Sequence, residues 1–340
     1  MKLGLVLGGG GLVGMAYHAG VLKALEDCGI DVSNSDVIVG TSAGSIIGSY
    51  LAAGWTQSDF FAYAQGEHPN AVRGEAEQED EVRRIFTPLW SNPAERARRT
   101  VGSLFTLASS RGYWSKASRG REPGSALKKG FPSGLYSTEE TRRRLHEDLP
   151  ETWPREGLFI CSVEMYSGKR VPFGHPDAPV VPLPEAVLAS TAIPGVFPPV
   201  NINGTRYVDG GAYSATSLDL ATDEGCDAII CVAPLGYKMD GVVTARDPKI
   251  WFPMLARSLF ARALRREVLA AREKGVAVMV LRPGTTELKT HGTNAMRHFD
   301  RATFTQETRE STLKVLEQAS DDPALSIWRN SATPTKERVS

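Results

Sequence analysis

A small-residue motif near the amino terminus is the first place in this sequence that could carry chemistry. The stretch GTSAG at 40–44 fits the pattern GxSxG, in which a sharp strand-to-helix turn exposes a nucleophilic serine. Gly40 and Gly44 are needed because so tight a turn leaves no room for side chains beside the serine. An apolar run at 36–39 precedes the motif, and a helical pattern of small residues at 43–53 follows it. This context predicts that Ser42 is a nucleophile.

A second glycine-rich motif, GGGGLVG at 8–14, ends an apolar run and opens a helical pattern. Small residues let several backbone N–H groups point at one anion there, helped by the positive end of the helix dipole. The carboxyl ends of parallel strands lie at one edge of a sheet, so the two motifs would meet. We therefore expect the amides of Gly9, Gly10 and Gly11 to form an oxyanion hole beside the serine.

The same glycines allow a different function, nucleotide binding, because Gly9, Gly11 and Gly14 match GxGxxG. That fingerprint expects an acidic residue about 20 residues further on, at the end of the second strand, to hold a ribose. Here the second strand runs into the Ser42 turn instead, which argues against a dinucleotide. A non-catalytic binder of nucleotide or lipid, using the glycine loop without turnover, is one alternative.

A nucleophilic serine needs a base, and two kinds are available. The chain order of an α/β-hydrolase triad would require His291 or His298, although neither lies at a clear strand end. The other candidate is Asp209, in YVDGG at 207–211, which closes a hairpin strand. Gly210 and Gly211 permit a sharp turn that would leave the Asp209 carboxylate facing a cleft. A histidine-triad carboxylesterase is thus the alternative to an aspartate-based hydrolase.

The elements around these motifs fit an α/β protein with a mostly parallel sheet. Strand patterns occur at 2–7, 36–39, 158–165, 170–173, 200–202, 206–208, 228–232 and 276–281. Helical patterns occur at 12–28, 43–53, 184–192, 251–272 and 303–319, and Asn203-Gly204 predicts a hairpin turn. We expect one domain over 1–325, interrupted by an irregular charged insertion at about 65–132, and a frayed tail at 326–340.

Composition excludes several classes of protein. The chain has 340 residues, 41% hydrophobic and 23% charged, as in globular proteins, and 39 basic residues balance 39 acidic ones. Zero net charge gives no support for a nucleic-acid partner. The four cysteines lack metal-ligand spacing and are typical of reduced thiols, so we expect no metal site. With no signal peptide and no apolar stretch long enough to span a membrane, we expect a cytoplasmic protein.

Taken together, the motifs resemble those of the patatin-like phospholipases, in their bacterial form. LVLGGGGLVG at 5–14 is similar to the oxyanion motif of that family, GTSAGS at 40–45 to its nucleophile elbow, and VDGG at 208–211 to its aspartate motif. ASTAIPGVFPP at 189–199 resembles the segment before the aspartate, and GTNAM at 292–296 continues the likeness more weakly. The order and the separations of the motifs also match.

The resemblance implies a three-layer α/β/α sandwich and the hydrolysis of lipid acyl esters by a Ser–Asp dyad, without a histidine or a cofactor. Ser42 would be the nucleophile, Asp209 its base, and Gly9–Gly11 the oxyanion-hole donors. Val13 stands where many bacterial members carry Arg or Lys, so ester hydrolysis is implied more strongly than a phospholipid preference.

A hydrolase of lipids must also reach a lipid surface. Basic residues are dense at 111–129 and at 249–274, and the second segment has an apolar stripe at helical spacing. A helix of this kind either lies in a membrane interface or packs its stripe against the core, and the second arrangement is the more common. We expect the insertion to be the lid-like element that makes peripheral contact with an anionic membrane.

Overall fold

The computed structural model describes residues 1–110, 133–236, 248–284 and 299–331 of the chain. Within them, eight strands form one sheet of order β5-β6-β3-β2-β1-β7-β8, with β4 paired to β3 beside this path. The strands are β1 (Leu3–Leu7), β2 (Val37–Thr41), β3 (Leu158–Glu164), β4 (Arg170–Phe173), β5 (Val200–Ile202), β6 (Thr205–Asp209), β7 (Ala228–Val232) and β8 (Ala277–Leu281). The five strands from β3 to β8 along this order run parallel, whereas β4, β5 and β6 are antiparallel additions.

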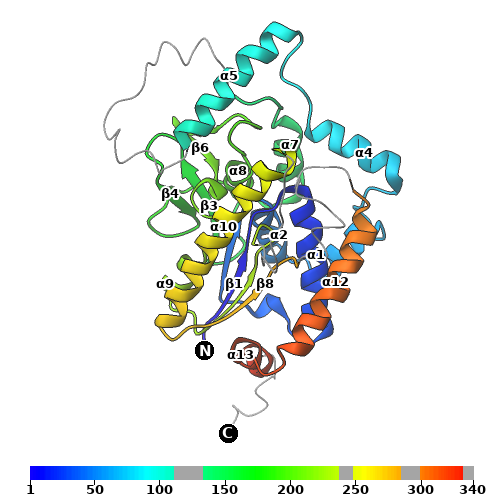
Figure 1. Ribbon diagram of the computed structural model, residues 1–340, viewed down its shortest axis with the longest axis vertical. Helices are drawn as coiled ribbons and strands as arrows, with labels where there is room; N and C mark the ends of the chain where they lie inside the picture. Colours follow the sequence, from blue (N-terminus) through cyan, green and yellow to red (C-terminus); the bar gives the residue numbers. More distant parts are fainter. Residues whose placement is uncertain (111–132, 237–247, 285–298, 332–340) are drawn as a thin grey trace.

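Helices cover both faces of the sheet, which gives the expected three-layer α/β/α sandwich (Figure 1). One face packs against α1 (Gly11–Asp27), α2 (Ala43–Ala52), α8 (Leu183–Ser190) and α13 (Pro323–Ser331), with α3 (Gln57–Gln65) and α12 (Arg301–Gln318) outside α1. The other face packs against α9 (Leu218–Asp223) and α10 (Pro248–Glu273). Residues alternate along β1, so that Leu5 and Leu7 join the first core and Val6 joins the second.

The predicted strands and helices of the core are confirmed, with shifts of a few residues at their ends. The hairpin prediction is also confirmed, because β5 pairs with β6 and both Asn203 and Gly204 have positive φ, at 51° and 83°. In α10, Leu264, Val268 and Ala271 are buried against the sheet. The core-packed arrangement is therefore the correct one for the described part of this basic segment.

Two predictions of irregular structure are wrong. The insertion contains α4 (Gly74–Ile85) and α5 (Pro93–Ser110), and α7 (Glu139–Asp148) follows it. The tail contains most of α13, in which Trp328 is only 1% exposed. The described side chains of both helices are mainly exposed, and α4 is a charged run with few apolar residues, which is why the sequence did not indicate a helix there. The basic segment at 111–129 lies outside the described residues.

Candidate active site

The turn between β2 and α2 holds Ser42 in a strained conformation, with φ 53° and ψ −120°. Such a backbone costs about 1–3 kcal/mol in a non-glycine residue and persists only where the surroundings enforce it. The surroundings here are very close, because a Cβ added to Gly44 would lie 1.9 Å from the carbonyl oxygen of Leu7. A Cβ on Gly40 would lie 2.7 Å from the Cα of Ser45. The two glycines thus permit a strand-to-helix turn with the serine at its apex.

Sheet register brings Asp209 to the serine. Thr41 pairs with Cys161 on β3, and the next β3 residue, Ser162, pairs with Asp209 at the end of β6. The Ser42 hydroxyl lies close enough to the Asp209 carboxylate to favour its charged form and lower its pKa, and both residues are buried, at 6% and 5% exposure. The 167 residues that separate them in the sequence are bridged by these two strand pairings.

The Asp209 carboxylate is fixed on its other side by the turn that follows it. The amide of Gly211 donates to Oδ1 at 2.7 Å. Gly210 must lack a side chain, because a Cβ there would lie 2.3 Å from the carbonyl oxygen of Cys161. Both motif glycines after the aspartate therefore have a physical reason: Gly210 allows close packing on β3, and the Gly211 amide holds the carboxylate.

Burial raises the pKa of Asp209 from its ordinary value of 3.8 to about 6, although the hydrogen bonds from Ser42 and Gly211 favour the charged form. Desolvation is the larger effect because the carboxylate has lost its water. A carboxylate with a pKa near 6 is a stronger base than an exposed aspartate and is still ionised at neutral pH. This is the range in which general bases work best.

The glycine loop lies beside the serine, since a Cβ added to Gly9 would be 3.3 Å from the Ser42 Cβ. Three glycines were predicted to donate to an oxyanion, and the structure corrects this for Gly9. The Gly9 amide already donates to the carbonyl of Ala215 at 2.8 Å. The amides of Gly10 and Gly11, at the start of α1, have no acceptor among the described residues. Helix N-terminal amides of this kind suit a developing negative charge.

A buried histidine, His18, holds the glycine loop in place from within α1. The His18 ring, fully buried in α1, donates from Nε2 to the carbonyl of Gly8 at 2.8 Å. Burial lowers the pKa of His18 to about 4, so the ring is neutral and can donate only from the nitrogen that carries its proton. His18 therefore positions the loop and does not act as a base. The sequence offered no pattern that distinguished it from a core histidine.

Glu267 on α10 supports the loop from the other side. Its carboxylate accepts hydrogen bonds from the Thr216 hydroxyl at 2.7 Å, the Leu218 amide at 3.1 Å and the Ser214 hydroxyl. These contacts fix residues 214–218, which include the Ala215 carbonyl that holds Gly9. Burial raises the pKa of Glu267, while its three donors favour the charged form. No sequence motif predicted this residue, because it lies 49 to 53 positions from its partners.

The Ser42 amide is held by Ser190. The Ser190 hydroxyl accepts a hydrogen bond from this amide at 2.9 Å and donates one to the Cys161 carbonyl at 2.6 Å. The alternative bases His291 and His298 lie outside the described residues. In the described part of the chain, no group of three His, Cys, Asp or Glu side chains is arranged to hold a metal.

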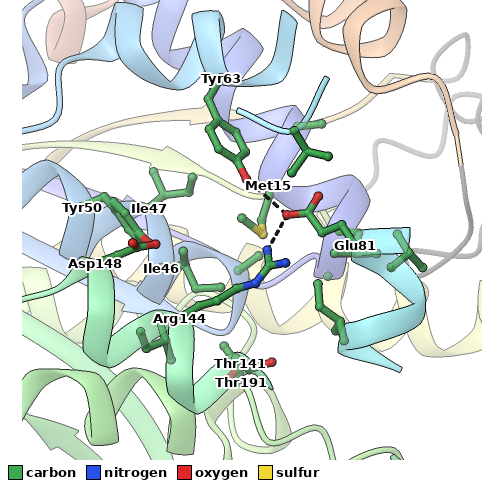
Figure 2. A pocket seen from close by; sticks show the side chains of 18 of the residues that line it. Met15, Ile46, Ile47, Tyr50, Tyr63, Glu81, Thr141, Arg144, Asp148 and Thr191 are labelled. Atoms are coloured by element: carbon green, nitrogen blue, oxygen red, sulfur yellow. Dashed lines mark hydrogen bonds and ion pairs between the residues drawn. The ribbon is translucent and has the colours of Figure 1, made fainter. Parts of the chain in front are cut away.

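A cavity of about 470 Å³ opens beside Ser42 and runs between α1, α2 and α7 (Figure 2). Near the serine it is lined by apolar side chains of α1, α2 and α8, and α4 forms part of one wall. Such a volume and lining are typical of a site for a small, largely apolar ligand. The cavity and the Ser42–Asp209 pair together make this edge of the sheet the candidate active site.

The comparison with family models gives the same class. Residues 5–222 match the model described as patatin-like phospholipase, and this chain belongs to that family. The match includes the glycine loop, Ser42 and Asp209.

Curated relatives are fungal. Proteins named lysophospholipase nte1 from Aspergillus fumigatus and from Neosartorya fischeri are each 29% identical over 233 residues, covering 68% of this chain. The chain spans 12% of the length of these relatives. A lysophospholipase NTE1 from Coccidioides immitis is 58% identical over 51 residues, or 15% of this chain and 3% of that protein. The bacterial form of the family, expected from the motifs, thus stays a prediction.

Two solved structures are similar over much of the chain. VipD from Legionella pneumophila has a TM-score of 0.42 and 16% identity, covering 93% of this chain and 66% of that one. The type III effector ExoU has a TM-score of 0.37 and 16% identity, covering 93% of this chain and 53% of that one. No helix in the described parts of the present chain has the length and apolar character needed to cross a bilayer.

Proposed function

We propose that this protein is a serine hydrolase of lipid acyl esters that works through a Ser42–Asp209 dyad. The observation that carries the proposal is the meeting of the strained Ser42 turn with the buried Asp209 carboxylate, which adjoining strand pairings bring together. A carboxylate in direct contact with the hydroxyl can remove its proton without a histidine. In this proposal the chain as far as the end of α13 forms one domain, and the insertion covers part of its pocket.

The dyad performs the reaction in two halves. Asp209 takes the hydroxyl proton as the Ser42 Oγ bonds to the ester carbonyl carbon, and the carbonyl electron pair moves to oxygen. The amides of Gly10 and Gly11 donate to that oxyanion; one such donor is worth about 100–1,000-fold in rate. When the tetrahedral intermediate collapses, the bond to the alcohol breaks, and the alcohol leaves with the proton from Asp209.

The second half releases the acyl group. Asp209 accepts a proton from water as the water oxygen attacks the acyl-serine carbonyl. The bond to the Ser42 Oγ then breaks, and Oγ recovers its proton from Asp209 as the fatty acid leaves. Each proton that Asp209 accepts is returned within the same half-reaction, so one ester and one water give one alcohol and one acid.

Labelling with a fluorophosphonate tests the proposal, because only an activated serine reacts with it. We expect labelling of the wild type, none of Ser42→Ala, and very little of Asp209→Asn. Ser49→Ala, a buried serine of the same helix whose hydroxyl has no partner among the described residues, is the matched control and should label normally. Labelling of a folded Ser42→Ala protein would exclude Ser42 as the nucleophile.

The two alternative functions give different results in the same assay. A histidine-triad esterase would lose labelling when His291 and His298 are both replaced by alanine, whereas the dyad would keep it. A non-catalytic binder of nucleotide or lipid would not be labelled even as wild type. A panel of lipid esters that includes lysophospholipids, suggested by the names of the fungal relatives, then identifies the substrate.

The proposal extends to the place where the enzyme works. We infer a cytoplasmic protein from its four unpaired cysteines, of which Cys161, Cys226 and Cys231 are buried. We also infer peripheral contact with anionic membranes through the basic insertion. Binding to phosphatidylserine vesicles that weakens with salt would support this contact, and its absence at low salt would favour a substrate free in solution.

A further inference from the structure

Two helices, α1 and α2, each contribute one face to the part of the cavity that begins at the serine. On α2 the lining residues are Ser42 at the start, Ile46 and Ile47 one turn later, and Tyr50 after two turns. The facing side of α1 contributes Leu12, Met15, Ala16 and Ala19 at the same helical spacing. The cavity therefore extends from the nucleophile along α2. Eight residues at 1.5 Å each give it a length of about 12 Å to Tyr50.

Aromatic side chains gather in the lining about two turns of α2 away from Ser42. Trp55 is the centre of the cluster, with its ring 4.9 Å from Tyr50, 5.1 Å from Phe60 and 5.8 Å from Tyr63. The Tyr50 hydroxyl also donates to the Asp148 carboxylate of α7 at 2.6 Å, which fixes the ring across the cavity. Packed rings of this kind do not yield easily to a ligand. They form a floor about two helical turns below the serine.

One wall of the cavity is held by a buried ion pair (Figure 2). Glu81 of α4, only 5% exposed, accepts from Arg144 of α7 at 2.6 Å and from Arg301 of α12 at 2.7 Å. The same helix contributes Val82 and Ile85 to the lining. Because Arg144 lies on α7 and Arg301 on α12, the two ion pairs hold α4 in place as a wall of the cavity.

We propose that this cavity binds the acyl group and selects medium-chain esters, with an upper limit of about ten carbons; the inference rests on the proposed hydrolase function. An ester carbonyl at Ser42 directs its acyl chain between α1 and α2. An extended alkyl chain advances about 1.25 Å per carbon, given bonds of about 1.5 Å and angles near 111°. A path of about 12 Å therefore holds nine to ten carbons before the chain meets Tyr50 and Trp55.

A series of p-nitrophenyl esters with acyl chains of 4, 6, 8, 10, 12 and 16 carbons tests this limit, at one detergent concentration for all. For the wild type we expect kcat/KM to rise as far as C8 or C10, since each further methylene buries more apolar surface in the cavity. It should then fall at least tenfold by C16. A wild type that prefers C16, or shows no dependence on length, would overturn the inference.

Two variants move the limit in opposite directions. Tyr50→Ala removes part of the floor and should raise the C16/C8 ratio of kcat/KM at least tenfold. Ile46→Trp fills the cavity one turn below the serine and should lower the C10/C4 ratio by a similar factor. Tyr166→Ala, in the turn after β3, changes a tyrosine away from the cavity and should leave both ratios unchanged. If Ile46→Trp keeps the wild-type ratio, the chain does not lie along α2.

The failure of this inference differs from a failure of the hydrolase function. If the protein is labelled at Ser42 and hydrolyses esters of every chain length equally, the hydrolase function is supported and the chain-length limit is refuted. A protein that hydrolyses none of the esters and is not labelled would lose both. Because the ratios compare two esters on one variant, partial unfolding of Tyr50→Ala cannot imitate the expected change.

Discussion

Replacing Asp209 by asparagine should remove the activity and also change how the stability of the fold depends on pH. The pKa of this carboxyl is 3.8 ordinarily and about 6 in the folded protein. The folded protein thus binds the proton more tightly than the unfolded chain does. The contribution of this bound proton to the free energy of unfolding is therefore complete below pH 3.8 and is lost as the pH rises through about 6. Two pH units correspond to about 3 kcal/mol over the whole range.

The practical window is narrower, because other carboxylates titrate in acid. Between pH 5 and 7.5 the wild type should lose about 1 kcal/mol of unfolding free energy through Asp209 alone. Asparagine keeps the shape without a titrating proton, so Asp209→Asn should not lose this contribution. For a chain of 340 residues this free energy corresponds to roughly 1–2 °C in Tm. The Tm of Asp209→Asn, measured relative to that of the wild type, should therefore be higher by this amount at pH 7.5 than at pH 5.

Thermal unfolding of the two proteins by circular dichroism, at pH 5, 6 and 7.5, measures this difference. The quantity to compare is the gap between the two Tm values at each pH, since the local cost of the asparagine amide is the same at every pH. The exposed Asp321→Asn is the control and should run parallel to the wild type. If the gap for Asp209→Asn is also constant with pH, Asp209 has no raised pKa and the case for it as the base is weakened.

The remaining predictions concern other parts of the site and fold. The kcat/KM of the wild type should fall about tenfold per pH unit below about 6, as Asp209 becomes protonated; a level profile down to pH 4.5 would contradict its role. Gly10→Ala places a methyl group 2.7 Å from the Pro234 Cβ, so kcat should fall about 100-fold with little change in KM; a pure KM effect would mean that Gly10 does not serve the oxyanion. Glu267→Gln should lower kcat roughly tenfold at constant KM, whereas equal rates would show that the 214–218 loop needs no buried acceptor. Trp328→Ala should lower the unfolding free energy, measured by urea denaturation, by about 3–5 kcal/mol. An unchanged free energy would mean that the carboxyl-terminal segment is frayed, as the sequence predicted.

Short-range patterns explain why much of the fold could be predicted. The hairpin at Asn203-Gly204 and the turn at Ser42 depend on a few neighbouring residues whose backbone angles are restricted by residue type. The strands of the parallel sheet are buried on both faces, so they are continuous apolar runs in the sequence. The approach of Asp209 to Ser42 also follows from topology, once both are placed at strand ends.

Features that depend on distant partners could not be predicted. Glu81 is an ordinary residue of an acidic run until Arg144 and Arg301, 63 and 220 positions away, make it the buried anchor of α4. The Gly9 amide looked available because its acceptor, the Ala215 carbonyl, lies on a loop with no recognisable motif. In both cases the sequence specifies the chemical group but not the contact that decides what it does.

The end of the cavity is built partly by residues outside the matched family region. The match ends at 222, yet Phe299 and Arg301 line the same cavity as Ser42. Part of the lining therefore comes from a stretch of the chain that lies outside the catalytic motifs, so substitutions near the start of α12 can change the preferred substrate while the dyad stays unchanged. Enzymes that share the catalytic motifs can therefore differ in substrate preference. Exchanging residues 299–331 between relatives is a direct way to change that preference.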